Sequence, residues 1–158
     1  MPLVLEILRH GEAEPAGAKG DSARRLSPAG RSAVGALAAR LAREGWRPDR
    51  IFSSPMLRAL ETAEIVREAT PRAPAIERLE ELLPESEPSD VLAALVAHGA
   101  AAGTVLLATH QPLAGRLAAH LTGAAPAFRP GTLVRIELAA GPGAGEGRVV
   151  STFEPAAS

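Results

Sequence analysis

The sequence predicts an α/β fold: a three-layer α/β/α sandwich with a mainly parallel central sheet and an edge hairpin near the C-terminus. Three observations predict it. Short apolar runs alternate with amphipathic segments over residues 3–121, as expected when right-handed crossovers place helices on both faces of a sheet. Residues 104–109 are expected to form a strand whose continuous apolar run, 105–108, is typical of a strand buried on both faces. Residues 132–138 and 148–153 have strand character and are joined by a Gly-rich segment, which predicts the hairpin.

Capping residues set the expected helix boundaries. Ser27 and Pro28 suit the N-cap and first position of a helix that runs to about Arg43 and stops at Gly45. A second Ser-Pro pair, at residues 54–55, predicts the start of the next helix. The remaining helices are expected from Ser89 to before Gly99 and over 112–121, and the remaining strands at 3–8, 50–53 and 75–78.

Two segments without periodicity are expected to be loops. Residues 12–26 follow the first strand and are long enough to cover a functional site. Residues 77–90 are acidic and punctuated by proline, which predicts a loop with room for one helical turn.

Composition limits the classes of function. A length of 158 residues with 46% hydrophobic content predicts one domain over 1–158. The net charge of -1 argues against binding to nucleic acid or to a membrane surface, and the 3% aromatic content provides no base-stacking platform. The absence of cysteine excludes disulfides and thiolate chemistry. With no signal-peptide pattern and no long apolar run, we expect a cytoplasmic protein.

Charged side chains follow three of the predicted strands. Arg9 and His10 end the first strand, Arg58 lies just after the second, and His110 ends the central one. A parallel sheet brings these ends to one edge, where ligands bind. Two guanidinium groups beside two imidazoles suit a tetrahedral dianion such as phosphate, and a helix N-terminus adds positive potential. A zinc site at His10 and His110 would need a further ligand, which the sequence does not indicate.

Three motifs carry a resemblance to a known family. An R-H-G stands at residues 9–11, an S-P-x-x-R-A-x-x-T-A segment at 54–63, and a histidine at 110 after a late apolar strand. In this order the chain resembles the histidine phosphatase superfamily, which includes the phosphoglycerate mutases. Its small size and residues 21–30 and 110–113 are most similar to the short bacterial phosphohistidine phosphatases of the SixA type.

The resemblance implies roles for individual residues. His10 would be the nucleophile that becomes a transient phosphohistidine, with Arg9, Arg58 and His110 binding the phosphoryl oxygens. The nucleophile must be neutral, so we expect nearby arginines to lower its pKa and a backbone carbonyl to fix its tautomer. Arg24 and Gln111 are further substrate-binding candidates, and no metal or other cofactor is implied.

The sequence departs from larger family members at the general acid. In those proteins a glutamate in an insertion has this role, and this chain lacks the insertion. Glu81 is the preferred candidate, among four glutamates at 80, 81, 85 and 87. An alkoxide is a poor leaving group unless an acid protonates it, since its conjugate acid has a pKa near that of bulk water, about 15.7. An imidazolium has a pKa of only about 6.5. A weak or missing acid therefore favours phosphoramidate substrates.

The preferred hypothesis is a metal-independent phosphatase acting on a phosphorylated protein that carries phosphohistidine. The alternatives are a phosphatase of a small phosphate ester and a non-catalytic module that binds phosphorylated ligands. A mutase is disfavoured because the chain has little insertion to close over an intermediate. His98 and His120 lack motif partners and are expected on the surface or at helix ends, and Glu12 has no role that the sequence explains.

Overall fold

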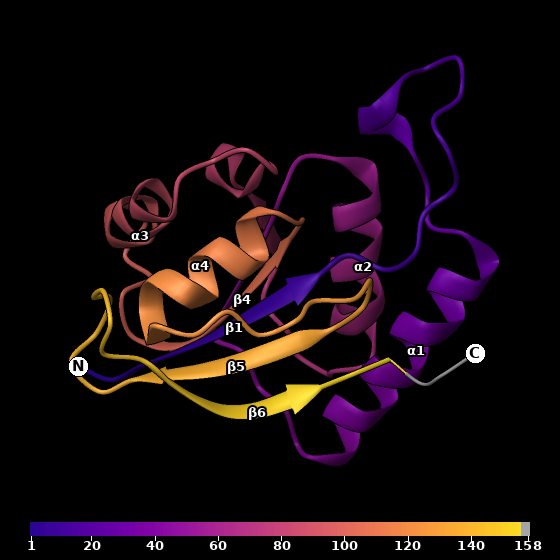
Figure 1. Ribbon diagram of the computed structural model, residues 1–158. Helices are drawn as coiled ribbons and strands as arrows, with labels where there is room; N and C mark the ends of the chain where they lie inside the picture. The colour runs from indigo at the N-terminus through magenta and orange to yellow at the C-terminus, as the bar shows by residue number, and fades with distance from the viewer. Residues whose placement is uncertain (156–158) are drawn as a thin grey trace.

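The computed structural model describes residues 1–155, which form a six-stranded sheet of order β3-β2-β4-β1-β5-β6 (Figure 1). Strand β1 lies between a parallel neighbour, β4, and an antiparallel one, β5. Strands β2 and β3 continue the parallel half, and β6 pairs antiparallel with β5 at the other edge. The strands are β1 (Leu3–Arg9), β2 (Arg50–Ser53), β3 (Ile76–Arg78), β4 (Gly103–Thr109), β5 (Leu133–Leu138) and β6 (Arg148–Phe153).

Helices cover both faces of the sheet (Figure 1). Those on one face are α1 (Pro28–Arg43) and α2 (Leu57–Glu68), and those on the other are α3 (Pro88–Ala97) and α4 (Leu113–Thr122). Two 3-10 turns, η1 (Asp21–Ala23) and η2 (Glu80–Leu82), lie in the predicted loops. The predicted three-layer fold with its C-terminal hairpin is confirmed. Within residues 1–155, none of the helices combines the length and apolarity that crossing a membrane requires.

The core lies on both faces of the central strands. Residues 105–108 of β4 are fully buried, as predicted for a strand covered twice. On one face Leu107 belongs to the cluster that includes Leu117 of α4, and on the other Leu106 belongs to the cluster that includes Val34 of α1. Each such side chain contributes about 1.5–3 kcal/mol by leaving water. This packing fixes the central strands and the residues at their ends.

Two predicted helix starts are wrong. Helix α2 begins at Leu57 with Met56 as its N-cap, two residues later than the Ser54-Pro55 pair suggested. The reason is that the Ser54 hydroxyl oxygen accepts the Met56 N–H within a turn and also contacts His110, so Ser54 does not cap the helix. Helix α3 begins at Pro88, which suits the first turn of a helix, so Ser89 lies inside the helix.

The loop between β1 and α1 extends from the body of the molecule (Figure 1) and is pinned at its base by Glu12. The Ser27 backbone N–H donates to the Glu12 carbonyl at 3.0 Å, and the Ser27 hydroxyl donates to the Glu12 carboxylate at 3.0 Å. Ser27 also caps α1 by accepting the Gly30 N–H at 3.0 Å. Glu12 therefore has a structural role that the sequence did not reveal.

Glycine at position 30 makes this close approach possible, which gives a stability prediction. A Cβ at Gly30 would lie 2.1 Å from the Glu12 carbonyl oxygen, whereas one at Gly35 in the same helix would meet nothing within 4 Å. Gly30→Ala should lower the free energy of unfolding by about 1–3 kcal/mol because backbone must move. Gly35→Ala should raise it by about 0.5–1 kcal/mol through helix propensity. Urea unfolding of both variants tests this, and equal effects would contradict it.

Candidate active site

Strand register brings the predicted site residues together. Arg9 of β1 pairs with Thr109 of β4, so the next residue of each strand, His10 and His110, leaves the sheet side by side. Their rings meet edge to face, with centroids 5.0 Å apart and an interplanar angle of 62°. Ser53 of β2 pairs with Ala108, which places Ser54 beside them. The carboxyl ends of three strands thus carry one cluster of side chains.

His10 is held as a neutral imidazole of defined tautomer. Its Nδ1 lies 2.7 Å from the Gly11 carbonyl oxygen, and because a carbonyl only accepts, Nδ1 carries the proton. Its Nε2 keeps a lone pair and accepts the Arg58 Nε–H at 3.3 Å. Burial, aided by the charges of Arg58 and Arg9, lowers the pKa of His10 from 6.5 to about 4. The direction matches the prediction, but burial contributes more than the arginines do.

Thr62 closes a ring of hydrogen bonds around this imidazole. The Gly11 N–H donates to Thr62 Oγ1 at 3.1 Å, and that hydroxyl donates to the Arg58 carbonyl oxygen at 2.8 Å. The Arg58 side chain in turn contacts His10, so the end of β1 and the first turns of α2 are fixed to one another. Thr62 is the threonine of the S-P-x-x-R-A-x-x-T-A segment, but the sequence alone gave it no role.

His110 is buried and contacts Ser54, with Nε2 2.8 Å from the hydroxyl oxygen. That oxygen already accepts the Met56 N–H, so its own proton is available for His110 Nε2, an arrangement that leaves the ring proton on Nδ1. Within residues 1–155, His110 Nδ1 is buried without a hydrogen-bond partner. Burial, with the neighbouring His10 and Arg58, lowers the pKa of His110 to about 3.

Arg9 completes what we call the His–Arg cluster, defined as Arg9, His10, Arg58 and His110. One terminal nitrogen of Arg9 donates to the Phe128 carbonyl at 2.8 Å. In the part of the chain that the structure describes, its Nε is buried without a partner. The cluster thus combines two guanidinium groups with two imidazoles held neutral by burial.

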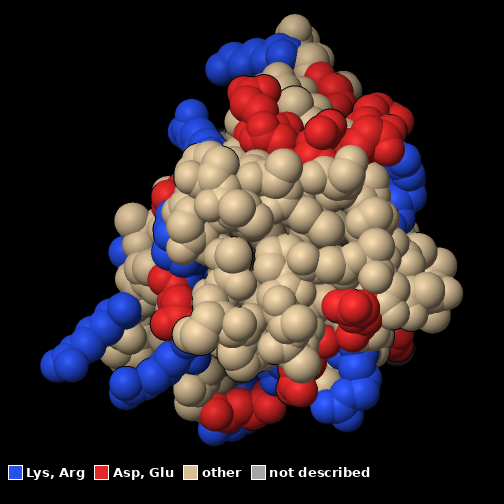
Figure 2. Space-filling model, turned by 90° about the vertical axis from the view of Figure 1, so that its left-hand side faces the viewer, with Lys and Arg blue, Asp and Glu red and all other residues tan. Residues whose placement is uncertain are grey.

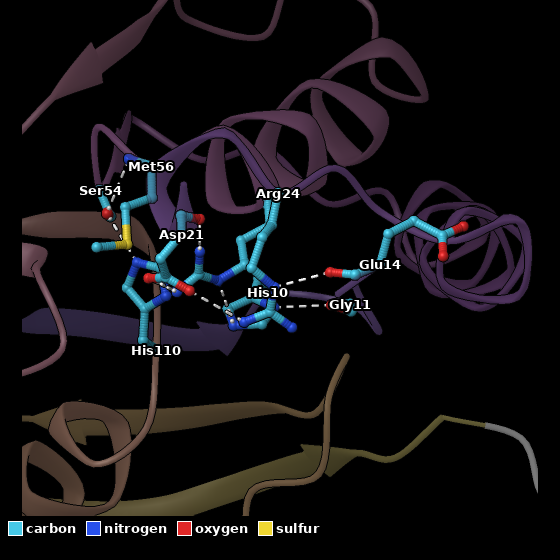
Figure 3. A network of polar contacts seen from close by, with 9 residues as sticks. His10, Gly11, Glu14, Asp21, Arg24, Ser54, Met56 and His110 are labelled. Carbon is cyan, nitrogen blue, oxygen red and sulfur yellow. Dashed lines mark hydrogen bonds and ion pairs between the residues drawn. The ribbon is translucent and has the colours of Figure 1, made fainter. Parts of the chain in front are cut away.

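Asp21 and Arg24, from the loop between β1 and α1, lie against this cluster (Figure 3). Arg58 donates to the Asp21 backbone carbonyl at 2.8 Å and to its carboxylate at 3.2 Å. Arg24 donates to the other carboxylate oxygen of Asp21 at 3.2 Å and to the Glu14 carbonyl at 2.7 Å. The structure therefore places Arg24 at the site through Asp21, a residue for which the sequence suggested no role.

Two further candidates take different positions. The side-chain oxygen of Gln111 accepts the Gly115 N–H at 2.7 Å, so Gln111 caps the first turn of α4. Glu81 lies half-buried in η2, which is tied to the cluster's edge of the sheet because Thr109 Oγ1 donates to the Leu82 carbonyl at 2.7 Å. Among residues 1–155, no group of three or more His, Cys, Asp and Glu side chains is arranged to hold a metal ion.

Comparison with protein families gives a match to the histidine phosphatase superfamily (branch 1) over residues 5–85, about half of the chain. The chain belongs to this superfamily. The match covers both motifs that end β1 and begin α2, and the resemblance inferred from the sequence is confirmed. The histidine phosphatase superfamily includes phosphatases. No sequence among curated proteins matches this chain significantly.

Solved structures similar to this member of the superfamily include SixA proteins. The protein histidine phosphatase SixA complexed with tungstate is 29% identical, with a TM-score of 0.85 over 96% of this chain and 97% of that one. A protein of Agrobacterium tumefaciens assigned as a SixA phosphohistidine phosphatase is 21% identical, with a TM-score of 0.79 over 96% and 98%. An Entamoeba histolytica phosphoserine phosphatase mutant in complex with phosphoserine shares the fold at 13% identity, with a TM-score of 0.71 over 95% and 96%.

The two buried histidines predict how stability depends on pH. Their folded-state pKa values, about 4 for His10 and about 3 for His110, lie below the ordinary value of 6.5. As pH falls below 6.5, the two histidines become protonated in the unfolded chain but stay neutral in the folded protein. The free energy of unfolding therefore falls toward pH 4. His110→Gln, which keeps a polar group near Ser54, should reduce this slope in denaturant unfolding measured at each pH. An unchanged slope would contradict the burial argument.

Proposed function

We propose that the chain is a metal-independent phosphatase that acts through a covalent phosphohistidine on His10, with protein phosphohistidine as its substrate. The observation that carries the proposal is the fixed neutral tautomer of His10, whose unprotonated Nε2 lies beside the Arg58 guanidinium. A neutral imidazole with an unprotonated ring nitrogen can attack phosphorus, whereas an imidazolium cannot. The ring needs no deprotonation step at neutral pH because burial keeps it neutral.

The reaction would take two steps. His10 Nε2 attacks phosphorus, the bond to the leaving group breaks, and its electron pair goes to the leaving atom. Water then attacks phosphorus from the same open side, the bond to Nε2 breaks, and phosphate is released with His10 restored. Arg9, Arg58 and His110 would hold the phosphoryl oxygens as charge develops on them. The guanidinium charges supply the stabilisation that a metal ion supplies in other phosphoryl-transfer sites.

Two buried groups support oxyanion binding at the cluster. Arg9 Nε and His110 Nδ1 are buried polar atoms without partners among the described residues. Such groups are costly unless a hydrogen-bond partner satisfies them, and a phosphoryl oxygen is a suitable acceptor. The SixA protein that resembles this chain binds tungstate, which is a tetrahedral oxyanion like phosphate.

The choice of phosphohistidine over an ester is based on the leaving group. Glu81 is the preferred general acid; it lies in η2, at the same sheet edge as His110, and among the described residues no hydrogen bond or ion pair joins its side chain to the cluster. An imidazole leaving group departs without a well-placed acid, whereas an alkoxide needs one. The likeness to SixA proteins supports the same substrate class. A small phosphate ester is the second candidate, because η2 does bring a glutamate to this edge.

Replacing the nucleophile tests the activity. His10→Ala should reduce phosphate release from a phosphohistidine peptide by at least about a thousandfold, because no other group can form the covalent intermediate. The matched control is His120→Ala in the last turn of α4, which should leave the rate unchanged. Phosphate binding to the wild type without turnover would instead support a binding module, and full activity of His10→Ala would refute the proposal.

Replacing Glu81 tests the choice of substrate class. If Glu81 protonates alkoxides, Glu81→Gln should slow phosphoserine hydrolysis by about a hundredfold, the usual contribution of a general acid. Phosphohistidine hydrolysis should change by less than about threefold, because its leaving group needs no added proton. Steady-state kcat/KM for both substrates gives the comparison, with Glu85→Gln as the control in the same segment. A wild type that prefers the ester by a large factor would overturn the phosphohistidine assignment.

A further inference from the structure

Asp21 is a charged residue beside the His–Arg cluster that has no role in the two proposed steps. Its carboxylate bridges two arginines, with one oxygen 3.2 Å from Arg58 and the other 3.2 Å from Arg24. The side chain of Arg58 is buried, whereas that of Asp21 is 57% exposed to solvent. In Figure 3 Asp21 lies beside the two histidines, and the Glu14 carboxylate of the same loop points away from them. An anion at this position is unexpected in a site built to bind a phosphoryl dianion.

The carboxylate is ionised and cannot act as a proton donor. Hydrogen bonds from Arg24, together with the charge of Arg58, lower the pKa of Asp21 below its usual range. Any contribution to the reaction must therefore come from its negative charge. Asp21 is also among the charges that act on His110, so its field reaches the centre of the cluster.

The expected path of the leaving group can be compared with the position of Asp21 through Arg58. In-line attack by His10 Nε2 requires the leaving atom to lie on the far side of phosphorus. Because His10 is buried, we expect that side to face solvent; the Asp21 carboxylate is exposed to solvent and contacts Arg58, whose Nε lies 3.3 Å from His10 Nε2. The leaving group of the substrate would therefore lie near the negative charge of Asp21.

A segment next to His110 carries further negative charge, part of which is paired with Arg50 and Arg116. The segment that contains η2 is tied to β4 next to His110 and is rich in exposed carboxylates. Figure 2 faces the side of the molecule that lies on the left in Figure 1, and it shows Asp and Glu side chains gathered near the top of that side, above a largely uncharged central region. Such a field attracts cationic groups and repels anionic ones. The acidic residues of this segment are Glu77, Glu80, Glu81, Glu85, Glu87 and Asp90.

We infer that Asp21 determines specificity by binding the protonated imidazole ring of a phosphohistidine substrate. This inference rests on the proposed function. The ring nitrogen that does not carry phosphorus would donate a hydrogen bond to the Asp21 carboxylate. The P–N bond then breaks with its electron pair on nitrogen, and the ring leaves as neutral imidazole with its proton in place. No general acid is needed, because the substrate brings the proton.

The same carboxylate selects against esters that carry negative charge. A phosphoglycerate would place its carboxylate near Asp21 and the acidic segment, where like charges repel. A phosphoserine peptide gains no hydrogen bond to Asp21, and the negative charge that develops on its leaving oxygen is weakly disfavoured by the carboxylate. The three substrates thus respond differently to the loss of one charge.

The test compares kcat/KM of the wild type and Asp21→Asn on three substrates: a phosphohistidine peptide, the same peptide with phosphoserine, and 3-phosphoglycerate. Asparagine keeps the size of the side chain and an accepting oxygen, and Arg58 retains its bond to the backbone carbonyl of residue 21. Glu14→Gln is the matched control, since it removes one charge from the same loop at a side chain that points away from the cluster (Figure 3).

Asp21→Asn should lower phosphohistidine hydrolysis by about tenfold, the size of one charge-assisted hydrogen bond, and leave phosphoserine unchanged or faster. Hydrolysis of 3-phosphoglycerate should rise, and Glu14→Gln should keep all wild-type ratios. An equal fall for all three substrates would show that Asp21 only positions Arg58 and Arg24, and unchanged ratios would also overturn the inference. A wild type inactive on phosphohistidine but active on esters would refute the proposed substrate itself.

Discussion

The hydrogen bond from His10 Nδ1 to the Gly11 carbonyl is the interaction on which the proposed chemistry depends. It fixes the proton on one ring nitrogen and leaves the other unprotonated, facing Arg58. The bond is local, but the geometry around it is not, because Gly11 donates to Thr62 and Thr62 donates to the backbone of Arg58. A single ring of hydrogen bonds thus joins the end of β1 to helix α2, which carries Arg58.

The sheet makes this ring possible through register. Pairing of Arg9 with Thr109 and of Ser53 with Ala108 sets three strand ends level, and most residues of these strands are buried, which stabilises the register. Burial also lowers the pKa values of both histidines and so keeps them neutral. The apolar core therefore contributes directly to the reactivity of the site.

The sequence predicted the parts of the molecule that depend on periodicity and on motifs at strand ends. The layers, the hairpin and the meeting of His10, Arg58 and His110 follow from such signals. It failed where a residue has a second partner far along the chain. Ser54 looked like a helix cap, but its hydroxyl is committed to His110. The side-chain oxygen of Gln111 caps α4, a contact that the sequence did not indicate, and its substrate-binding role stays a prediction. Asp21, Thr62 and Glu12 matter through contacts between distant segments, and no local pattern indicates such contacts.

The most direct measurement of the central claim is the position of the phosphoryl group on the trapped enzyme. The protein is incubated with phosphoramidate, quenched in alkaline denaturant, and examined by peptide mass spectrometry and phosphorus NMR. Because Nδ1 is occupied by Gly11, the account predicts a single phosphohistidine at residue 10, substituted on Nε2. Phosphorylation on Nδ1 of His10, on His110 or on any other residue would contradict it, as would continued turnover with no phosphorylated enzyme.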